Sequence, residues 1–119
     1  MDIEASIFFT EYSISPNALA ATLEERGSDS LWVAEHSDIP VVRRFNVPTG
    51  GELERHYYDV IDPFITASAV AAGTTRLRLA TGLCLVIQRD TIQTAKLVSS
   101  LDQVSGGRFI FGIGGGWNA

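Results

Sequence analysis

The sequence is poor in cysteine, in basic residues and in long apolar runs. Cys84 is the only cysteine of 119 residues, so no intrachain disulfide can form, which fits a reducing compartment. Nine scattered Lys and Arg residues stand against fourteen Asp and Glu residues, and the net charge of -5 repels a phosphate backbone. No apolar run approaches the roughly 18 residues of a membrane span, and the first residues are acidic, unlike a secretory signal. We therefore expect a cytoplasmic protein without nucleic-acid or membrane partners.

The glycine-rich stretch 112–118 lacks the signatures of the common nucleotide-binding loops. Gly112 and Gly114 occupy the first two positions of a Gly-x-Gly-x-x-Gly pattern, but Trp117 stands at the third, and no Walker A lysine follows. This argues against an open-sheet nucleotide-binding module. No spacing of histidines, cysteines or carboxylates suggests a metal site, and we expect none.

What the sequence does contain is an alternation of strand-like and helix-like segments. With 45% hydrophobic and 19% charged residues, the composition is that of an ordinary globular domain, and residues 1–119 form a single predicted unit. The predicted strands are Ile3–Phe9, Ser30–Ala34, Arg76–Gly82 and Arg108–Phe111. Between them lie three predicted helices, 15–27, 62–73 and 90–106, each with an N-cap at its start and a glycine at its end. In the last helix, Ile92, Ala95, Val98 and Leu101 are predicted to share the packing face. The alternation predicts an α/β fold with a parallel sheet.

This order of elements is half of a (β/α)8 barrel, the TIM barrel, a fold of about 250 residues. An open α/β sheet also fits the same order. An isolated half-barrel leaves the outer edges of its first and last strands unpaired. We therefore expect the N-terminal half of an incomplete barrel of about four strands and three helices, completed by a missing C-terminal half or by a homo-oligomer.

The candidate site residues follow the ends of the predicted strands, where parallel α/β folds bind their ligands. They are Tyr12, Ser13, Glu35, His36, Asp38, Thr81, Gly82, Cys84 and the stretch 112–118. Of these, Cys84 is interpreted as a small buried hydrophobe rather than a nucleophile, because no histidine lies near it in sequence.

His36 is the predicted catalytic residue, because an imidazole can exchange protons near neutral pH and can hydrogen-bond a negative charge developing on a reduced cofactor ring. The alternative is that it only caps the strand or packs against Trp32. Glu35 could orient the imidazole or contact a cofactor. Because adjacent strand residues point to opposite faces, Glu35 and His36 can line one pocket only if the strand has already ended.

The segment Ser37–Ile61 is much longer than the usual connection from a strand to a helix. It contains basic and aromatic residues that could form a lid over an anionic substrate or cofactor tail, namely Arg43, Arg44, His56, Tyr57 and Tyr58. A solvated loop is the alternative interpretation.

An ordered set of motifs resembles the luciferase-like monooxygenase family, and in detail its coenzyme F420-dependent branch. The motifs span nearly the whole chain: residues 31–36 (Leu-Trp-Val-Ala-Glu-His), 39–40 (Ile-Pro), 62–64 (Asp-Pro-Phe), 74–82 (Thr-Thr-Arg-Leu-Arg-Leu-Ala-Thr-Gly), 95–96 (Ala-Lys), 101–102 (Leu-Asp), 105–109 (Ser-Gly-Gly-Arg-Phe) and 112–118 (Gly-Ile-Gly-Gly-Gly-Trp-Asn). Many family members carry a second histidine after the first, where this chain has Ser37.

The resemblance implies a TIM-type barrel that binds coenzyme F420, a 5-deazaflavin, or alternatively FMN, at the carboxyl ends of its strands. It places His36 near the reactive edge of the ring and implies a non-proline cis peptide at Gly82–Leu83 behind the ring. The cofactor-binding residues implied in this way are Glu35, Thr81, Gly82, Leu83, Gly112, Gly114 and Asn118. The implied chemistry is hydride transfer to or from a small organic substrate, or monooxygenation if the cofactor is FMN. The rival hypothesis is a non-catalytic half-barrel with a structural or partner-pairing role.

Overall fold

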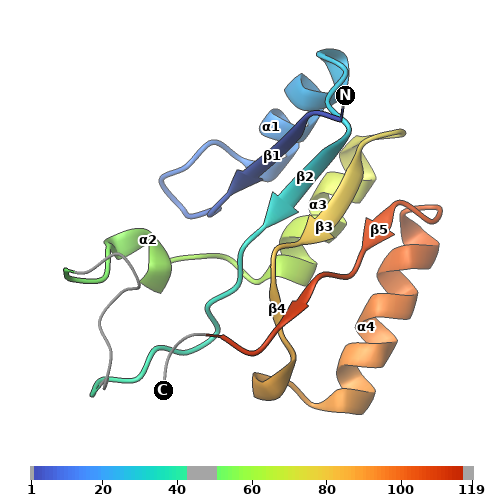
Figure 1. The fold of residues 1–119 in the computed structure, drawn as a ribbon. Coiled ribbons are helices and arrows are strands. Elements are labelled where there is room, and N and C mark those ends of the chain that lie inside the picture. The colour runs from blue at the N-terminus through green and yellow to red at the C-terminus, as the bar shows by residue number, and fades with distance from the viewer. Residues whose placement is uncertain (1, 43–50, 117–119) are drawn as a thin grey trace.

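The computed structural model describes residues 2–42 and 51–116 and is built on a four-stranded parallel sheet. The strands are β1 (Glu4–Ile7), β2 (Ser30–Val33), β3 (Arg78–Thr81) and β5 (Phe109–Ile110), in the spatial order β1-β2-β3-β5 (Figure 1). All three pairings are parallel. The predicted parallel α/β fold is therefore confirmed, with each strand shorter than its predicted span.

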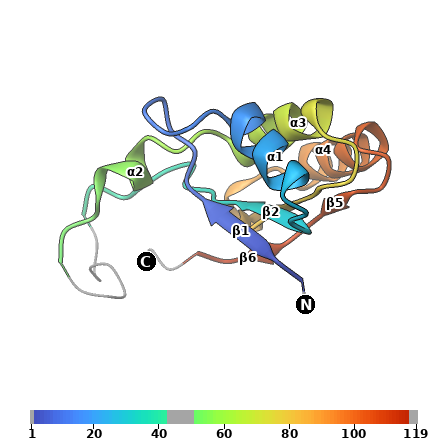
Figure 2. The same cartoon turned by 90° about the horizontal axis from the view of Figure 1, so that it is seen from above.

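Three long helices lie together on one face of this sheet: α1 (Pro16–Glu25), α3 (Pro63–Gly73) and α4 (Thr91–Val104), as Figure 2 shows. Each begins at the predicted N-cap. The side chains of Ser15, Asp62 and Asp90 accept hydrogen bonds from backbone N–H groups of their helices' first turns. Pro16 and Pro63 occupy the first helical positions, where the missing N–H costs nothing.

The core fills the space between the sheet and the helices. Its members include Leu31, Val33 and Leu79 from the strands and Ala20, Phe64, Ala67, Val70 and Leu101 from the helices. In α4, the side chains turned inward are those of Thr94, Val98 and Leu101, while Ile92 is 78% exposed and Ala95 is exposed. The predicted packing face was wrong for Ile92 and Ala95, because a spacing of three residues drifts by about 60° per step around the helix axis.

Strands β3 and β5 continue, after an interruption, as a second parallel pair, β4 (Cys84–Leu85) and β6 (Ile113–Gly114). The predicted strand Arg108–Phe111 thus ends sooner than expected and resumes two residues later. At the interruption, the Gly112 carbonyl accepts the N–H of Cys84 and the hydroxyl of Thr81, both at 2.8 Å. A Cβ atom at Gly112 would overlap the Thr81 carbonyl oxygen, and one at Gly114 would lie 2.6 Å from Leu83 Cδ1. Close strand approach therefore requires glycine at position 112, where the obstacle is backbone, whereas at position 114 the half-exposed Leu83 side chain would have to move.

Two further elements lie beyond the carboxyl ends of the strands: the short helix α2 (Arg55–Tyr58) and the 3-10 helix η1 (Val86–Gln88). Figure 1 shows α2 displaced to one side of the sheet, past the end of β1. The long loop Ser37–Ile61 therefore contains a helical turn that was not predicted from the sequence. No helix in the described part of the chain is long and apolar enough to cross a membrane.

Candidate active site at the carboxyl ends of the strands

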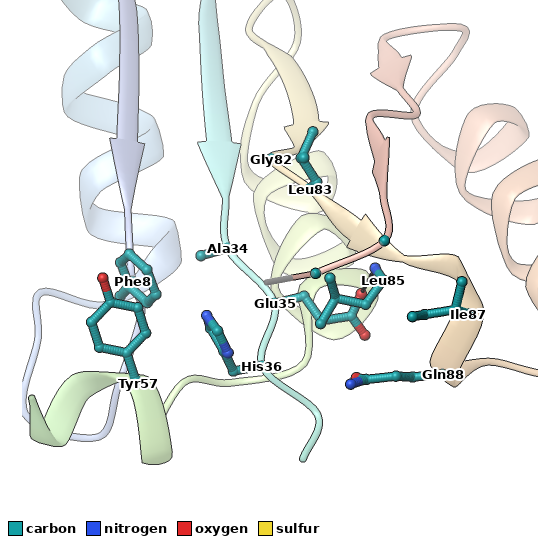
Figure 3. A pocket seen from close by; sticks show the side chains of 12 residues that line it. Phe8, Ala34, Glu35, His36, Tyr57, Gly82, Leu83, Leu85, Ile87 and Gln88 are labelled. Atoms are coloured by element: carbon teal, nitrogen blue, oxygen red, sulfur yellow. Dashed lines mark hydrogen bonds between the residues drawn. The ribbon is translucent and has the colours of Figure 1, made fainter. Parts of the chain in front are cut away.

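A cavity of about 440 Å³ opens at the carboxyl ends of the strands (Figure 3). In that view, Phe8 and Tyr57 lie on one side of His36, and Leu85, Ile87 and Gln88 lie on the other. The lining residues are Phe8, Ala34, Glu35, His36, Tyr57, Gly82, Leu83, Leu85, Ile87, Gln88, Gly115 and Gly116. Segments far apart in the sequence thus meet at one opening, and they include the predicted catalytic histidine.

His36 borders the cavity three residues after the end of β2. Its ring lies edge-on to Tyr57, with 5.0 Å between centroids, and is stacked on Phe8 at 6.2 Å. The indole of Trp32, the alternative packing partner, donates to the hydroxyl of Ser30 at 2.9 Å. Burial lowers the pKa of His36; the charge of Glu35 opposes this effect and His56 adds to it. The imidazole is therefore neutral at pH 7, so one ring nitrogen carries a proton and the other can accept one.

Glu35 also borders the cavity, because β2 ends at Val33 and the strand alternation no longer separates neighbouring residues. Its carboxylate is engaged on all sides. One oxygen accepts the Leu85 N–H at 2.7 Å, and the other accepts the Ser37 hydroxyl at 2.7 Å and Arg89 Nε at 2.6 Å. Ser37, which replaces the histidine of many family members, is thus a partner of Glu35.

The wall opposite His36 is formed largely by backbone. The Gly82–Leu83 peptide is cis, as the resemblance implied, and the Leu83 side chain is 49% exposed. Gly115 and Gly116 border the cavity without side chains of their own, and nothing lies within 4 Å of a Cβ atom placed at Gly115. Because these glycines have no side chains, a flat group in the cavity could lie directly against the backbone.

Other predicted site residues lie elsewhere. Thr81, Gly112 and Gly114 are outside the cavity lining and pack strands β3 to β6 together. Asn118 lies outside the described residues, and its predicted role stays a prediction. Cys84 is buried, as the interpretation of a small buried hydrophobe requires, and burial raises the pKa of its thiol to about 11.

Among the candidates that follow the first and second strands, some line a cavity and others do not. Tyr12 is 51% exposed beneath the guanidinium of Arg55, and the Ser13 hydroxyl accepts the N–H of Thr10; neither borders the cavity. Asp38 is exposed. Among the predicted lid residues, Arg43 and Arg44 lie outside the described residues, Tyr57 lines the cavity, and His56 packs edge-on to Phe8 at 4.7 Å. Tyr58 borders a second cavity of about 330 Å³.

Sequence reasoning missed five lining residues: Phe8, Ala34, Leu85, Ile87 and Gln88. A signal for Phe8 was available: in a strand, Phe8 and Phe9 must point to opposite faces, and Phe9 is 1% exposed in the core. Ile87 and Gln88 carried no such signal, because they belong to a helical turn that the pattern did not predict. Among residues 2–42 and 51–116, no three His, Cys, Asp or Glu side chains group as metal ligands.

Comparison with known proteins gives consistent matches. The profile of the luciferase-like monooxygenase family matches residues 17–119. An uncharacterised protein of Mycobacterium tuberculosis is 37% identical over 115 residues, which cover 94% of this chain and 41% of the relative. The chain thus spans about two fifths of the length of that curated relative.

Two solved structures show the same fold. One is the oxygenating constituent of 3,6-diketocamphane monooxygenase from Pseudomonas putida, in complex with FMN; it superposes with a TM-score of 0.74 at 18% identity, over 98% of this chain and 30% of that one. The other is the coenzyme F420-dependent tetrahydromethanopterin reductase from Methanopyrus kandleri, with a TM-score of 0.69 at 20% identity, over 98% of this chain and 27% of that one. The chain is therefore part of a barrel of the (β/α)8 type rather than an open sheet.

Proposed function

Because the chain belongs to the luciferase-like monooxygenase family, we propose that it forms the ring-binding part of a flavin- or deazaflavin-dependent oxidoreductase. The observation that carries the proposal is the cavity at the carboxyl ends of the strands, which is lined by His36 and by the glycine backbone of residues 82, 115 and 116. In barrels of this type the active site lies at that end. The chain covers 41% of the mycobacterial relative and 30% of the monooxygenase structure. Activity of the whole protein is therefore also part of this proposal.

The residues of the cavity fit a flat, largely apolar ring with polar edges. A volume of about 440 Å³ is within the range of small-molecule sites. Leu83, Leu85 and Ile87 supply apolar contact. Gly115 leaves open space where a side chain would project, whereas a Cβ atom at Gly116 would lie 3.4 Å from Leu85 Cδ2. Gly82, Leu83 and the glycine stretch that leads to Asn118 would hold the ring, while Thr81, Gly112 and Gly114 would support them from behind.

We propose coenzyme F420 as the cofactor and FMN as the alternative, since a relative of each kind shares the fold. A bound deazaflavin supplies two-electron hydride transfer to or from a small organic substrate, whereas FMN also permits oxygen insertion. The chain contributes His36, which in its neutral form donates or accepts one hydrogen bond at the ring edge. Phe8 and Tyr57, beside His36, form an aromatic wall that would exclude water from the reacting atoms.

Titration of the purified protein with coenzyme F420 and with FMN, followed by absorbance and fluorescence, tests the proposal. We expect saturable binding of the deazaflavin, weakened in His36→Ala and in Asn118→Ala. Gln103→Ala is the control, because Gln103 is exposed near the end of α4 and does not line the cavity. A folded protein that binds neither cofactor would support the rival hypothesis of a non-catalytic half-barrel.

The remaining strands of the barrel are a separate part of the proposal. Within the described residues, β1 and β5 are the outer strands of the sheet and pair on one side only. We propose that these edges pair with a C-terminal half or with a second copy of the chain. Light scattering distinguishes these two partners, because only pairing with a second copy requires the purified protein to have the mass of two or more chains.

A further inference from the structure

Arg89 lies at the centre of a charge network behind the cavity. Its side chain is 15% exposed, and that of Glu35 is 1% exposed. Nε of Arg89 donates to Glu35 at 2.6 Å, and Nη2 donates to Asp62 at 2.7 Å and also contacts Glu35. The guanidinium lies over the ring of Phe64, 4.9 Å from its centroid. One side chain thus joins the end of β2, the start of α3 and the turn before α4.

The network reaches the cavity through Glu35. The oxygen of Glu35 that Arg89 does not engage accepts the N–H of Leu85 at 2.7 Å. Leu85 lies in the same short segment as Gly82 and Leu83, which form the wall opposite His36. On the other side of this segment, the Gly112 carbonyl holds the N–H of Cys84 at 2.8 Å. The Val33 carbonyl also accepts the N–H of Gly82 at 2.7 Å, and β4 pairs with β6. Glu35 therefore makes one of several hydrogen bonds that hold this wall, and it is the side-chain acceptor for Leu85.

The Glu35 carboxylate depends on Arg89 to remain charged at this depth. Burial alone raises the pKa of Glu35, but hydrogen bonds from Arg89, Ser37 and Leu85 outweigh burial and hold that pKa below its ordinary value. Removing the guanidinium leaves a buried charge without its counter-ion, and such a carboxylate either takes up a proton or moves toward water. Both responses change its bond to Leu85.

We propose that Arg89 is a positioning residue of the proposed cofactor site, and that it acts by holding Glu35 so that Glu35 fixes the Leu83–Leu85 backbone at its distance from His36. This inference rests on the proposed function and extends it. Arg89 does not line the cavity, and its effect on a bound ring passes through Glu35 and Leu85. Lysine cannot replace it fully, because an ammonium group lacks the planar fork that engages Glu35 and Asp62 together.

The experiment compares wild type with Arg89→Gln and Arg89→Lys, using Arg108→Lys as a matched control at the opposite end of the sheet. Arg108 also makes several hydrogen bonds, donating to Ala71, Thr74, Leu77 and Ser105, but it lies far from the cavity lining. For each protein, the dissociation constants of coenzyme F420 and FMN are measured by fluorescence. Amide hydrogen exchange at Leu85 is measured without any cofactor.

We expect Arg89→Gln to weaken cofactor binding about tenfold or more and to remove the exchange protection of Leu85, since small displacements of a positioned group are costly. Arg89→Lys should fall between Arg89→Gln and wild type in both measurements. Arg108→Lys should lose stability yet bind cofactor like wild type. If Arg89→Gln does not fold, the comparison of Arg89→Lys with Arg108→Lys decides.

Unchanged protection of Leu85 in the Arg89 variants would overturn the inference, whatever the cofactor result. Equal weakening of binding by Arg108→Lys would also overturn it, because the effect would then be one of stability alone. If wild type binds neither cofactor, the proposed function fails, and the exchange of Leu85 still tests the link from Arg89 to the backbone.

Discussion

The two ends of the sheet differ in how they use charge and in how long their loops are. At the amino ends of the strands, the connections 26–29, 74–77 and 105–108 are four residues each. There the carboxylate of Glu24 accepts the N–H groups of Thr75, Arg76 and Leu77, and Arg108 donates to three carbonyls and one hydroxyl. At the carboxyl ends, the connections 8–15, 34–62 and 82–90 are longer, and Glu35 and Arg89 pair with each other.

This difference separates what holds the fold from what forms the site. Charges that meet backbone groups at the amino ends close short loops, and the cavity of about 320 Å³ beside them is lined by polar and charged residues and a glycine, namely Glu24, Gly27, Ser28, Asp29, Arg76 and Arg78. At the carboxyl ends, Arg89, Glu35 and Asp62 join long segments beside a cavity, and His36, Gly82 and Leu83 line that cavity. Changes at the amino ends should therefore alter stability alone, and changes at the carboxyl ends should alter the site as well.

Gly112→Ala should have the largest effect, because its Cβ atom would overlap the Thr81 carbonyl and push apart the strand pair behind the cavity. We expect a loss of at least about 3 kcal/mol in the free energy of unfolding, the upper end for overpacking. Denaturant unfolding measures it. Gly115→Ala is the control, since nothing lies within 4 Å of its added Cβ atom and its stability should be near that of wild type. Equal effects of the two variants would refute the close-approach argument.

Arg108→Gln tests the amino ends. We expect a loss of about 2 kcal/mol, because the carbonyls of Ala71 and Leu77 lose a charged donor. Arg78→Gln is the matched control: Arg78 makes an exposed ion pair with Asp2 at 3.9 Å, and its removal should cost less than about 0.5 kcal/mol. Chemical denaturation gives both values. If the NMR signals of the His36 ring changed in Arg108→Gln, the claim that changes at the amino ends of the strands affect stability alone would be wrong.

The pKa of His36 reports on the carboxyl ends. Because burial lowers this pKa, the ring should stay neutral to a pH below 6.5, as an NMR titration of its ring signals would show. The unfolded chain binds the proton first, so the stability that His36 contributes is present above pH 6.5 and is lost as the pH falls through that value.

Two variants sharpen the same titration. Glu35→Gln should lower the pKa of His36 further, and His56→Gln should raise it, because the charge of Glu35 favours the protonated ring and His56 opposes it. Glu24→Gln, at the opposite end of the sheet, should leave the titration unchanged. A pKa of His36 above 6.5 in the wild-type protein would show that burial is not the dominant cause.

Glu24→Gln should have a smaller effect on stability than Arg108→Gln at the same end of the sheet. The backbone N–H groups of Arg76 and Leu77 lower the pKa of Glu24 from 4.5, against a small opposing effect of burial. The stability that this carboxylate contributes is therefore present above pH 4.5 and is lost as the pH falls below it. Because solvent screens the group, we expect less than about 1 kcal/mol, visible as a weaker acid dependence of the melting temperature in the variant than in wild type.

Several local features were predictable because their cause lies within a few residues. Ser15-Pro16, Asp62-Pro63 and Asp90-Thr91 begin the three long helices as expected, since a cap needs only its own first turn. His36 was predictable as a cavity residue because it follows a buried strand. The face of α4 was not predicted correctly, since Ile92 and Leu101 lie about half a turn apart once the helix is built.

The sequence by itself determined the order of strands and helices, the helix starts and the family resemblance, because capping, periodicity and turn chemistry act over short distances. Only the tertiary structure decided that Phe8, Tyr57 and Ile87 line one cavity with His36. It also decided that the Thr81 carbonyl leaves no room for a side chain at Gly112, and that Arg89 forms an ion pair with Glu35, 54 residues away in the sequence. These contacts join segments that are far apart in the sequence, so they form only when the segments pack together. For Arg89 and Glu35, that packing also decides which buried charge has which counter-ion.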